Sequence, residues 1–164
     1  MPIVITETDL GTKERAKKAV KRVQKIIPKE LGPRLEKWWR KVERTAKKEC
    51  PVGTPASTGI PNYIGGTLRS SVRRVKTGKG LGKGGVPVKG VGVEFLSEMI
   101  VAGGLQFINP NTGKQCDYAV HVHDGTTKMR ARPFLRRAIE LNEQELKRIT
   151  DKFLKIVARE FSRD

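Results

Sequence analysis

The sequence predicts an α+β fold, with helices at both ends of the chain and an antiparallel sheet of about four strands between them. Two observations predict the helices and the strands. Before residue 50 and after residue 133, apolar residues recur at steps of three and four, which is the spacing of one helix face. In the middle of the chain, apolar and polar residues alternate in short runs, as in a strand with one face in water. Stretches rich in glycine and proline separate these runs and predict loops.

The N-terminal region is predicted to be one long kinked helix or a helical hairpin. Pro28 and Pro33 each remove a backbone donor and clash with the preceding turn, so a break or kink is expected between them. Thr12 can cap the start of the helix, which leaves residues 1–12 as an extended arm. The apolar stripe consists of Val20, Val23, Ile27, Leu31, Leu35, Trp38, Val42 and Ala46.

Four strands are expected after a loop that covers residues 52–66. The first spans residues 68–73 and has a basic face, because Leu68, Ser70 and Val72 alternate with Arg69, Ser71 and Arg73. The second covers 91–95, the third 105–108 and the fourth 118–122.

Residues 77–87, between the first two strands, are predicted to form a mobile basic loop, because fixing so many glycines costs backbone entropy. The motif from Gly78 to Lys83 is one residue shorter than a phosphate-binding P-loop, and Gly84 stands where a serine or threonine is required. A nucleotide site is therefore rejected.

The C-terminal helix is expected from Pro133 to about Phe161 and is expected to pack on the sheet. Its apolar stripe consists of Leu135, Ile139, Leu146, Ile149, Phe153, Ile156 and Val157. Neither a repeat nor a second domain is visible in the sequence, so residues 1–164 are predicted to form a single domain.

Positive charge is the strongest compositional signal. The formal net charge is +17, from 34 lysines and arginines against 17 acidic residues, and such an excess attracts polyanions. The candidate polyanion or partner contacts are Arg69, Arg73, Arg74, Lys76, Lys79 and Lys83, of which the three arginines are the leading candidates. The sequence has no helix-turn-helix spacing, no zinc-finger ligands and no aromatic RNA-binding motif. The positive charge is therefore not accompanied by an element that recognises a specific base sequence.

No catalytic set is recognisable in the sequence, and an enzyme is not predicted. His121 and His123 lie two apart on an expected strand and would share a face, but two imidazoles are too few for a zinc site. Cys50 and Cys116 lack metal-binding spacing and are interpreted as semi-buried thiols. No cofactor and no metal are therefore expected.

Two features bear on location and on subunit contacts. The chain has no signal-peptide pattern and no run of eighteen apolar residues, so it is expected to be made in the cytoplasm without a membrane partner. Trp38 and Trp39 lie on the helical stripe, where one ring can join the core and the other can fall at its edge. These two residues, with His121 and His123, are the candidate subunit-interface residues.

Several short motifs follow one another in an order that resembles a known family. Pro51-Val52-Gly53-Thr54 precedes Gly66-Thr67-Leu68-Arg69-Ser70-Ser71-Val72. The motif from Tyr118 to Thr126 follows, and then Arg132-Pro133-Phe134-Leu135 starts the last helix. Over residues 34–155, this order resembles the tail-completion or head-tail joining proteins of tailed bacteriophages. His123 and Asp124 depart from the family pattern, which usually has an acid and an aromatic residue there.

The resemblance implies a structural virion protein of the phage neck that forms a ring between head connector and tail. A hexamer is favoured over a dodecamer, and the implied partners are other copies, neighbouring neck, tail-terminator or tail-tube proteins and packaged double-stranded DNA. Such a ring makes head-to-tail contacts, so each subunit needs two complementary faces. Two alternatives stay open from the residues: a nonspecific DNA-binding protein with a basic surface, and a metal-dependent nuclease that uses His121 and His123.

Overall fold

The computed structural model describes residues 7–76, 90–95 and 98–163. The chain forms two compact units, and the single domain that we predicted stays a prediction. The helical unit contains Met1–Trp38 and Glu143–Asp164, and the sheet unit contains Trp39–Asn142. The predicted α+β class is confirmed. The predicted loop at residues 77–87 lies outside the described residues.

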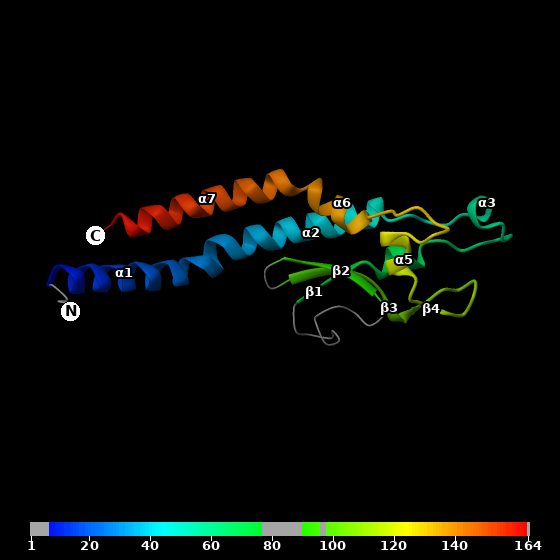
Figure 1. Cartoon of the computed structure of the whole chain (residues 1–164), viewed down its shortest axis with the longest axis horizontal. Coiled ribbons are helices and arrows are strands. Elements are labelled where there is room, and N and C mark those ends of the chain that lie inside the picture. Colours follow the sequence, from blue (N-terminus) through cyan, green and yellow to red (C-terminus); the bar gives the residue numbers. More distant parts are fainter. Residues whose placement is uncertain (1–6, 77–89, 96–97, 164) are drawn as a thin grey trace. The chain divides into compact units, whose positions relative to one another are not determined.

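The N-terminal region is one long helix with a π-helical turn inside it. Helix α1 (Glu7–Ile26) continues through η1 (Ile27–Leu31) into α2 (Gly32–Glu49) (Figure 1). Pro28 lies in the first turn of η1, where the wider π turn accommodates a residue that cannot donate a backbone hydrogen bond. The kinked-helix prediction is therefore confirmed, and the hairpin alternative is wrong.

The start of α1 differs from the prediction. The helix begins at Glu7, so Thr12 lies inside it and does not cap it, and residues 7–12 are helical where an extended arm was expected. The first six residues of the predicted arm lie outside the described part of the chain.

The C-terminal region contains two helices where one was expected. Helix α6 (Phe134–Glu140) belongs to the sheet unit and contacts β2. It is therefore the part of the predicted C-terminal helix that packs on the sheet. Helix α7 (Glu143–Phe161) belongs to the helical unit and lies beside α1 (Figure 1). Asn142 separates the two helices, and its Nδ2 donates to the carbonyl oxygen of Ala138 at 2.8 Å.

The sheet has three antiparallel strands in the order β1-β3-β2, where about four were expected. They are β1 (Arg73–Lys76), β2 (Gly90–Phe95) and the central β3 (Glu98–Ile108). Arg73 pairs with Val101 on one side of β3, and Val93 pairs with Ile100 on the other. The two-residue β4 (Gln115–Cys116) pairs with the far end of β3.

Two of the predicted strands are helices. Residues 68–71 lie in α4 (Thr67–Ser71), which buries Leu68 and Ser71 at a spacing of three. Residues 119–122 lie in α5 (Ala119–Asp124), which buries Ala119 and His123 at a spacing of four. A run of four to six residues is too short for its apolar pattern to distinguish a strand from one helical turn. The residues that are buried here lie three or four apart, which is the spacing of a helix.

The core of the sheet unit is built where α2, α6 and the sheet supply large side chains. Trp39, Val42, Ile100, Val101, Phe134 and Leu135 are all almost completely buried. A short helix, α3 (Pro55–Thr58), lies in the predicted loop and is capped by Thr54. The end of this loop is fixed by Asn111, whose side chain accepts from the Ile64 N–H and donates to the Ile64 carbonyl, both at 2.8 Å.

Candidate functional site

Of the predicted polyanion contacts, the structure describes the side chains of Arg69, Arg73 and Arg74. The guanidinium of Arg73 is half-buried and donates to the carbonyl oxygens of Ser71 at 3.1 Å and Gly103 at 2.9 Å. It also lies 5.1 Å from the ring centroid of Phe107. Burial lowers the pKa of Arg73. The guanidinium of Arg73 is thus held against the sheet by two carbonyls, and its contact with a polyanion stays a prediction.

The remaining predicted contacts are scattered. Arg69 is exposed on α4, and its Nη2 is 3.5 Å from the carbonyl oxygen of Cys50. Arg74 follows Arg73 on β1, so the two side chains leave opposite faces of the strand. Lys76 ends β1, and Lys79 and Lys83 lie outside the described residues.

The two histidines do not share a face. Residues two apart on a helix are separated by about 200°, and on α5 His121 is exposed while His123 is 5% exposed. His123 Nδ1 lies 2.6 Å from Asp124 Oδ1, and its ring meets Phe134 edge-on. The predicted shared face is therefore wrong. Within the described ranges no cluster of three or more His, Cys, Asp or Glu residues could hold a metal ion.

Trp38 and Trp39 are both buried, at 0% and 1% exposure. The expectation that one ring lies at the edge of the core is wrong, because neighbouring packing covers both. Neither tryptophan offers a surface to another subunit in this structure.

Two thiols and a phenol form a buried polar cluster in the sheet unit. Burial raises the pKa of Cys50 to about 12 and also raises the pKa of Cys116. Burial and the neighbouring Cys116 raise the pKa of Tyr118. Ser71 links the cluster to the sheet, because its Oγ donates to the Leu68 carbonyl and accepts from the Gly103 N–H, both at 2.7 Å. These thiols are protonated at neutral pH and are unsuited to act as nucleophiles.

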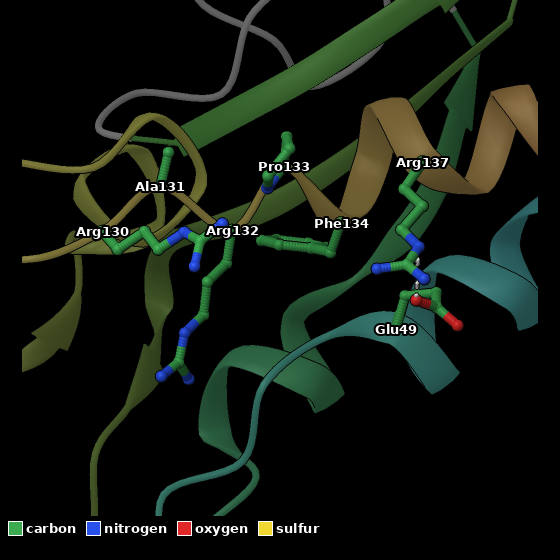
Figure 2. Close-up of a pocket in the computed structure, with 7 residues that line it drawn as sticks. All are labelled: Glu49, Arg130, Ala131, Arg132, Pro133, Phe134 and Arg137. Carbon is green, nitrogen blue, oxygen red and sulfur yellow. Dashed lines mark ion pairs between the residues drawn. The ribbon is translucent and has the colours of Figure 1, made fainter.

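An arginine-rich pocket of about 520 Å³ lies in the sheet unit between the end of α2 and the start of α6 (Figure 2). This surface, called the arginine pocket below, is lined by Glu49, Arg130, Ala131, Arg132, Pro133, Phe134 and Arg137. In Figure 2 the Phe134 ring points toward Arg132, and the Arg137 side chain extends from α6 toward Glu49. Apolar groups therefore form part of the wall, and cationic groups surround them.

Charge in the arginine pocket is unevenly balanced. Arg137 Nε lies 3.2 Å from Glu49 Oε2, so one arginine is paired. Arg130 and Arg132 are exposed, and neither side chain has an ion pair or hydrogen bond to any residue that the structure describes. With three arginines and one glutamate, the pocket carries a net charge of +2.

Backbone contacts hold the loop that carries these arginines. The Arg132 N–H donates to the Val122 carbonyl at 3.0 Å, and the Thr126 N–H donates to the Met129 carbonyl at 2.8 Å. Gly125 has a φ of +83°, and a Cβ there would lie 2.7 Å from the Ala131 nitrogen. The loop can therefore close only around a glycine at this position.

The arginine pocket was not predicted from the sequence. Arg132-Pro133-Phe134-Leu135 was interpreted only as the start of a helix, and the functional charge was expected in other segments. The run Arg130-Ala131-Arg132, directly before a proline and an aromatic residue, was the available signal.

A second notable surface is the apolar stripe of the helical unit. On α7 the one buried residue is the charged Glu160. The exposed apolar residues of α1, η1 and α7, called the helix-pair stripe below, are Val20 at 44%, Ile27 at 40%, Leu154 at 56% and Phe161 at 48%. A groove of about 240 Å³ lined by Thr12, Arg15, Ala16, Ala19 and Phe161 lies on this pair.

Comparisons with known proteins gave no match to a family model, to a curated protein or to a solved structure. Among the helices in the described part of the chain, none is both long enough and apolar enough to cross a membrane.

Proposed function

We propose that this protein is an assembling structural subunit, a tail-completion or neck protein of a tailed bacteriophage that forms a ring between head connector and tail. The observation that carries the assembly part of this proposal is the helix-pair stripe. Two helices of 20 and 19 residues lie together, yet several of their large apolar side chains stay about half exposed.

A two-helix pair has too little surface to cover both of its own apolar stripes. Burying a large aliphatic or aromatic side chain contributes about 1.5–3 kcal/mol of stability. Contact with another subunit would bury these side chains and would therefore stabilise an assembly relative to the isolated subunit. The amphipathic pattern of α7 supports this reasoning, because its apolar residues keep helical spacing although none of them is buried within the subunit.

The phage neck is the proposed setting because of the ordered motifs around residues 51–54, 66–72, 118–126 and 132–135. A ring in this position joins different neighbours on its two sides, and its contacts between copies are head-to-tail. The high positive charge suits a channel that contains packaged DNA or a surface that meets acidic proteins.

Native mass spectrometry of the purified chain, alone and with its adjacent gene products, tests the proposal. We expect a closed ring, with six copies favoured, in at least one of these samples. A chain that stays monomeric in every mixture and ignores those products would overturn it.

Nonspecific DNA binding is the alternative function, supported by the net charge and by Arg130 and Arg132, whose side chains pair with no residue that the structure describes. Phosphate binding would weaken linearly with salt on logarithmic axes, because it releases counterions. Assembly with a protein ring in the complete absence of DNA distinguishes the neck protein from this alternative.

A further inference from the structure

We propose that the arginine pocket binds an acidic peptide segment of another protein, with carboxylates on Arg130 and Arg132 and an apolar side chain against Ala131 and Pro133. This inference goes beyond the proposed function and does not depend on ring formation. It concerns a single site within the sheet unit.

The unpaired arginines supply the recognition chemistry. A guanidinium presents a planar fork of donors that matches a carboxylate with two parallel hydrogen bonds. The side chains of Arg130 and Arg132 have no partner in the described part of the chain, so a ligand that binds them breaks no ion pair with those residues.

Glu49 determines which side of the pocket the carboxylates occupy. It is already paired with Arg137 at 3.2 Å, and its negative charge repels a second carboxylate. The acidic groups of the ligand therefore lie on the side of Arg130 and Arg132, away from the Arg137–Glu49 pair. Ala131 and Pro133 are the exposed apolar residues of the lining, and they favour an uncharged side chain beside the carboxylates.

Shape favours a peptide over a DNA duplex. The volume of about 520 Å³ falls within the usual range for pockets that enclose small ligands, and it suits one or two side chains. A DNA duplex is a convex rod that could contact the rim but could not enter. Nucleic-acid phosphates would also leave the apolar part of the lining unused.

The loop is arranged before the ligand arrives. The Arg132 N–H and the Phe134 N–H donate to the carbonyls of Val122 and Arg132, at 3.0 and 2.8 Å. Binding to a site that is already ordered has a smaller entropic cost, because the loop does not have to become ordered on binding. The side chains of the two arginines still have to be fixed, which limits the expected affinity.

Fluorescence anisotropy tests the proposal with a short labelled peptide in which glutamates flank one phenylalanine. The test variant is the double change Arg130→Gln, Arg132→Gln. The matched control, Arg136→Gln with Arg148→Gln, removes the same charge from two exposed arginines that do not line the pocket. Circular dichroism melting curves check that each variant is folded, as expected for exposed positions.

We expect the test variant to weaken peptide binding at least about tenfold and the control to change it less than about twofold. A peptide with glutamines in place of the glutamates should bind far more weakly, and replacing its phenylalanine by alanine should also weaken binding. Equal losses in both double variants would overturn the proposal, because the net charge alone would then explain binding. Displacement of the peptide by a short DNA duplex at equal charge concentration would overturn it in favour of nucleic acid.

The same proteins can be examined by native mass spectrometry, so the two proposals fail separately. A ring that forms normally while the peptide does not bind removes only the arginine-pocket proposal. A monomer that binds the peptide removes only the assembly proposal.

Discussion

Arg22 of α1 and Glu160 of α7 join the two helices of the helical unit. Arg22 Nη2 donates to the Glu160 carbonyl at 2.9 Å, and Arg22 Nε lies 3.5 Å from Glu160 Oε2. The Glu160 carboxylate also accepts from Arg163 at 2.8 Å. The least exposed residue of α7 is therefore ionic, and we expect its charge to define the register of the pair more than its strength.

Glu160→Gln should destabilise the helical unit by about 1–3 kcal/mol, because the half-buried Arg22 loses its charged partner. Amide hydrogen exchange along α1 and α7 measures this effect. Glu140→Gln is the control, since Glu140 is exposed and has no partner in the described part of the chain. Equal exchange in the two variants would contradict a register role for Glu160.

Asn111→Ala should release the end of the loop that follows α3. The substitution removes two hydrogen bonds to the backbone of Ile64 and is expected to cost about 1–3 kcal/mol. The Ile64 amide should then exchange faster with deuterium. Gln115→Ala, at an exposed position on β4, should leave that amide unchanged, and an unchanged Ile64 amide in Asn111→Ala would show that the contact does not hold the loop.

Gly125→Ala should damage the arginine pocket more than Gly113→Ala does. Both glycines have a positive φ, so each substitution costs on the order of 1–3 kcal/mol of backbone strain. At Gly125 the new Cβ would also meet the backbone of Ala131, whereas at Gly113 nothing lies within 4 Å. Gly125→Ala should lower the unfolding temperature and weaken peptide binding more than Gly113→Ala does, as measured by thermal unfolding and peptide anisotropy. Equal effects of the two substitutions would show that the loop accommodates the new Cβ.

Stability should fall at alkaline pH. The folded-state pKa values of Cys50, Cys116 and Tyr118 are raised, with Cys50 at about 12. The native state therefore keeps protons that the unfolded chain releases, so stability is complete below about pH 9 and is lost as the pH rises toward 12. Urea unfolding between pH 8 and about 11 measures the slope, as an order-of-magnitude test of this linkage.

Tyr118→Phe removes one of the groups that titrate, so its stability should fall less steeply with pH than that of the wild type. Tyr63→Phe is the comparison: it removes a neighbour that also raises the pKa of Tyr118, so it should change the slope less than Tyr118→Phe does. A wild-type stability that is flat across this range would contradict the burial of the cluster.

The long helices could be predicted from sequence, whereas the short elements could not. The stripes that include Val20 and Ile156 repeat over many turns, so only a helix can place them on one face. Runs such as 68–72 and 118–122 hold too few residues to separate a strand from a helical turn. The division between α6 and α7 was missed because the apolar pattern continues across Asn142.

The candidate site was harder to predict because it depends on tertiary structure. Arg73 was expected at the surface, but its guanidinium donates to the carbonyl oxygens of Ser71 at the end of α4 and Gly103 on β3. Arg130 and Arg137 are brought to one pocket by the turn at Gly125 and by the contact of α6 with Glu49 of α2. No spacing in the sequence encodes either arrangement.

The central claim is that the helix-pair stripe joins subunits, and native mass spectrometry of Leu154→Gln against Leu141→Gln tests it most directly. Both leucines are more than half exposed, at 56% and 60%, so neither change should unfold the subunit, but only Leu154 belongs to the stripe. The account predicts that the wild type and Leu141→Gln form the same ring and that Leu154→Gln is shifted toward monomer. Identical assembly of all three proteins, or the loss of the ring in Leu141→Gln alone, would contradict it.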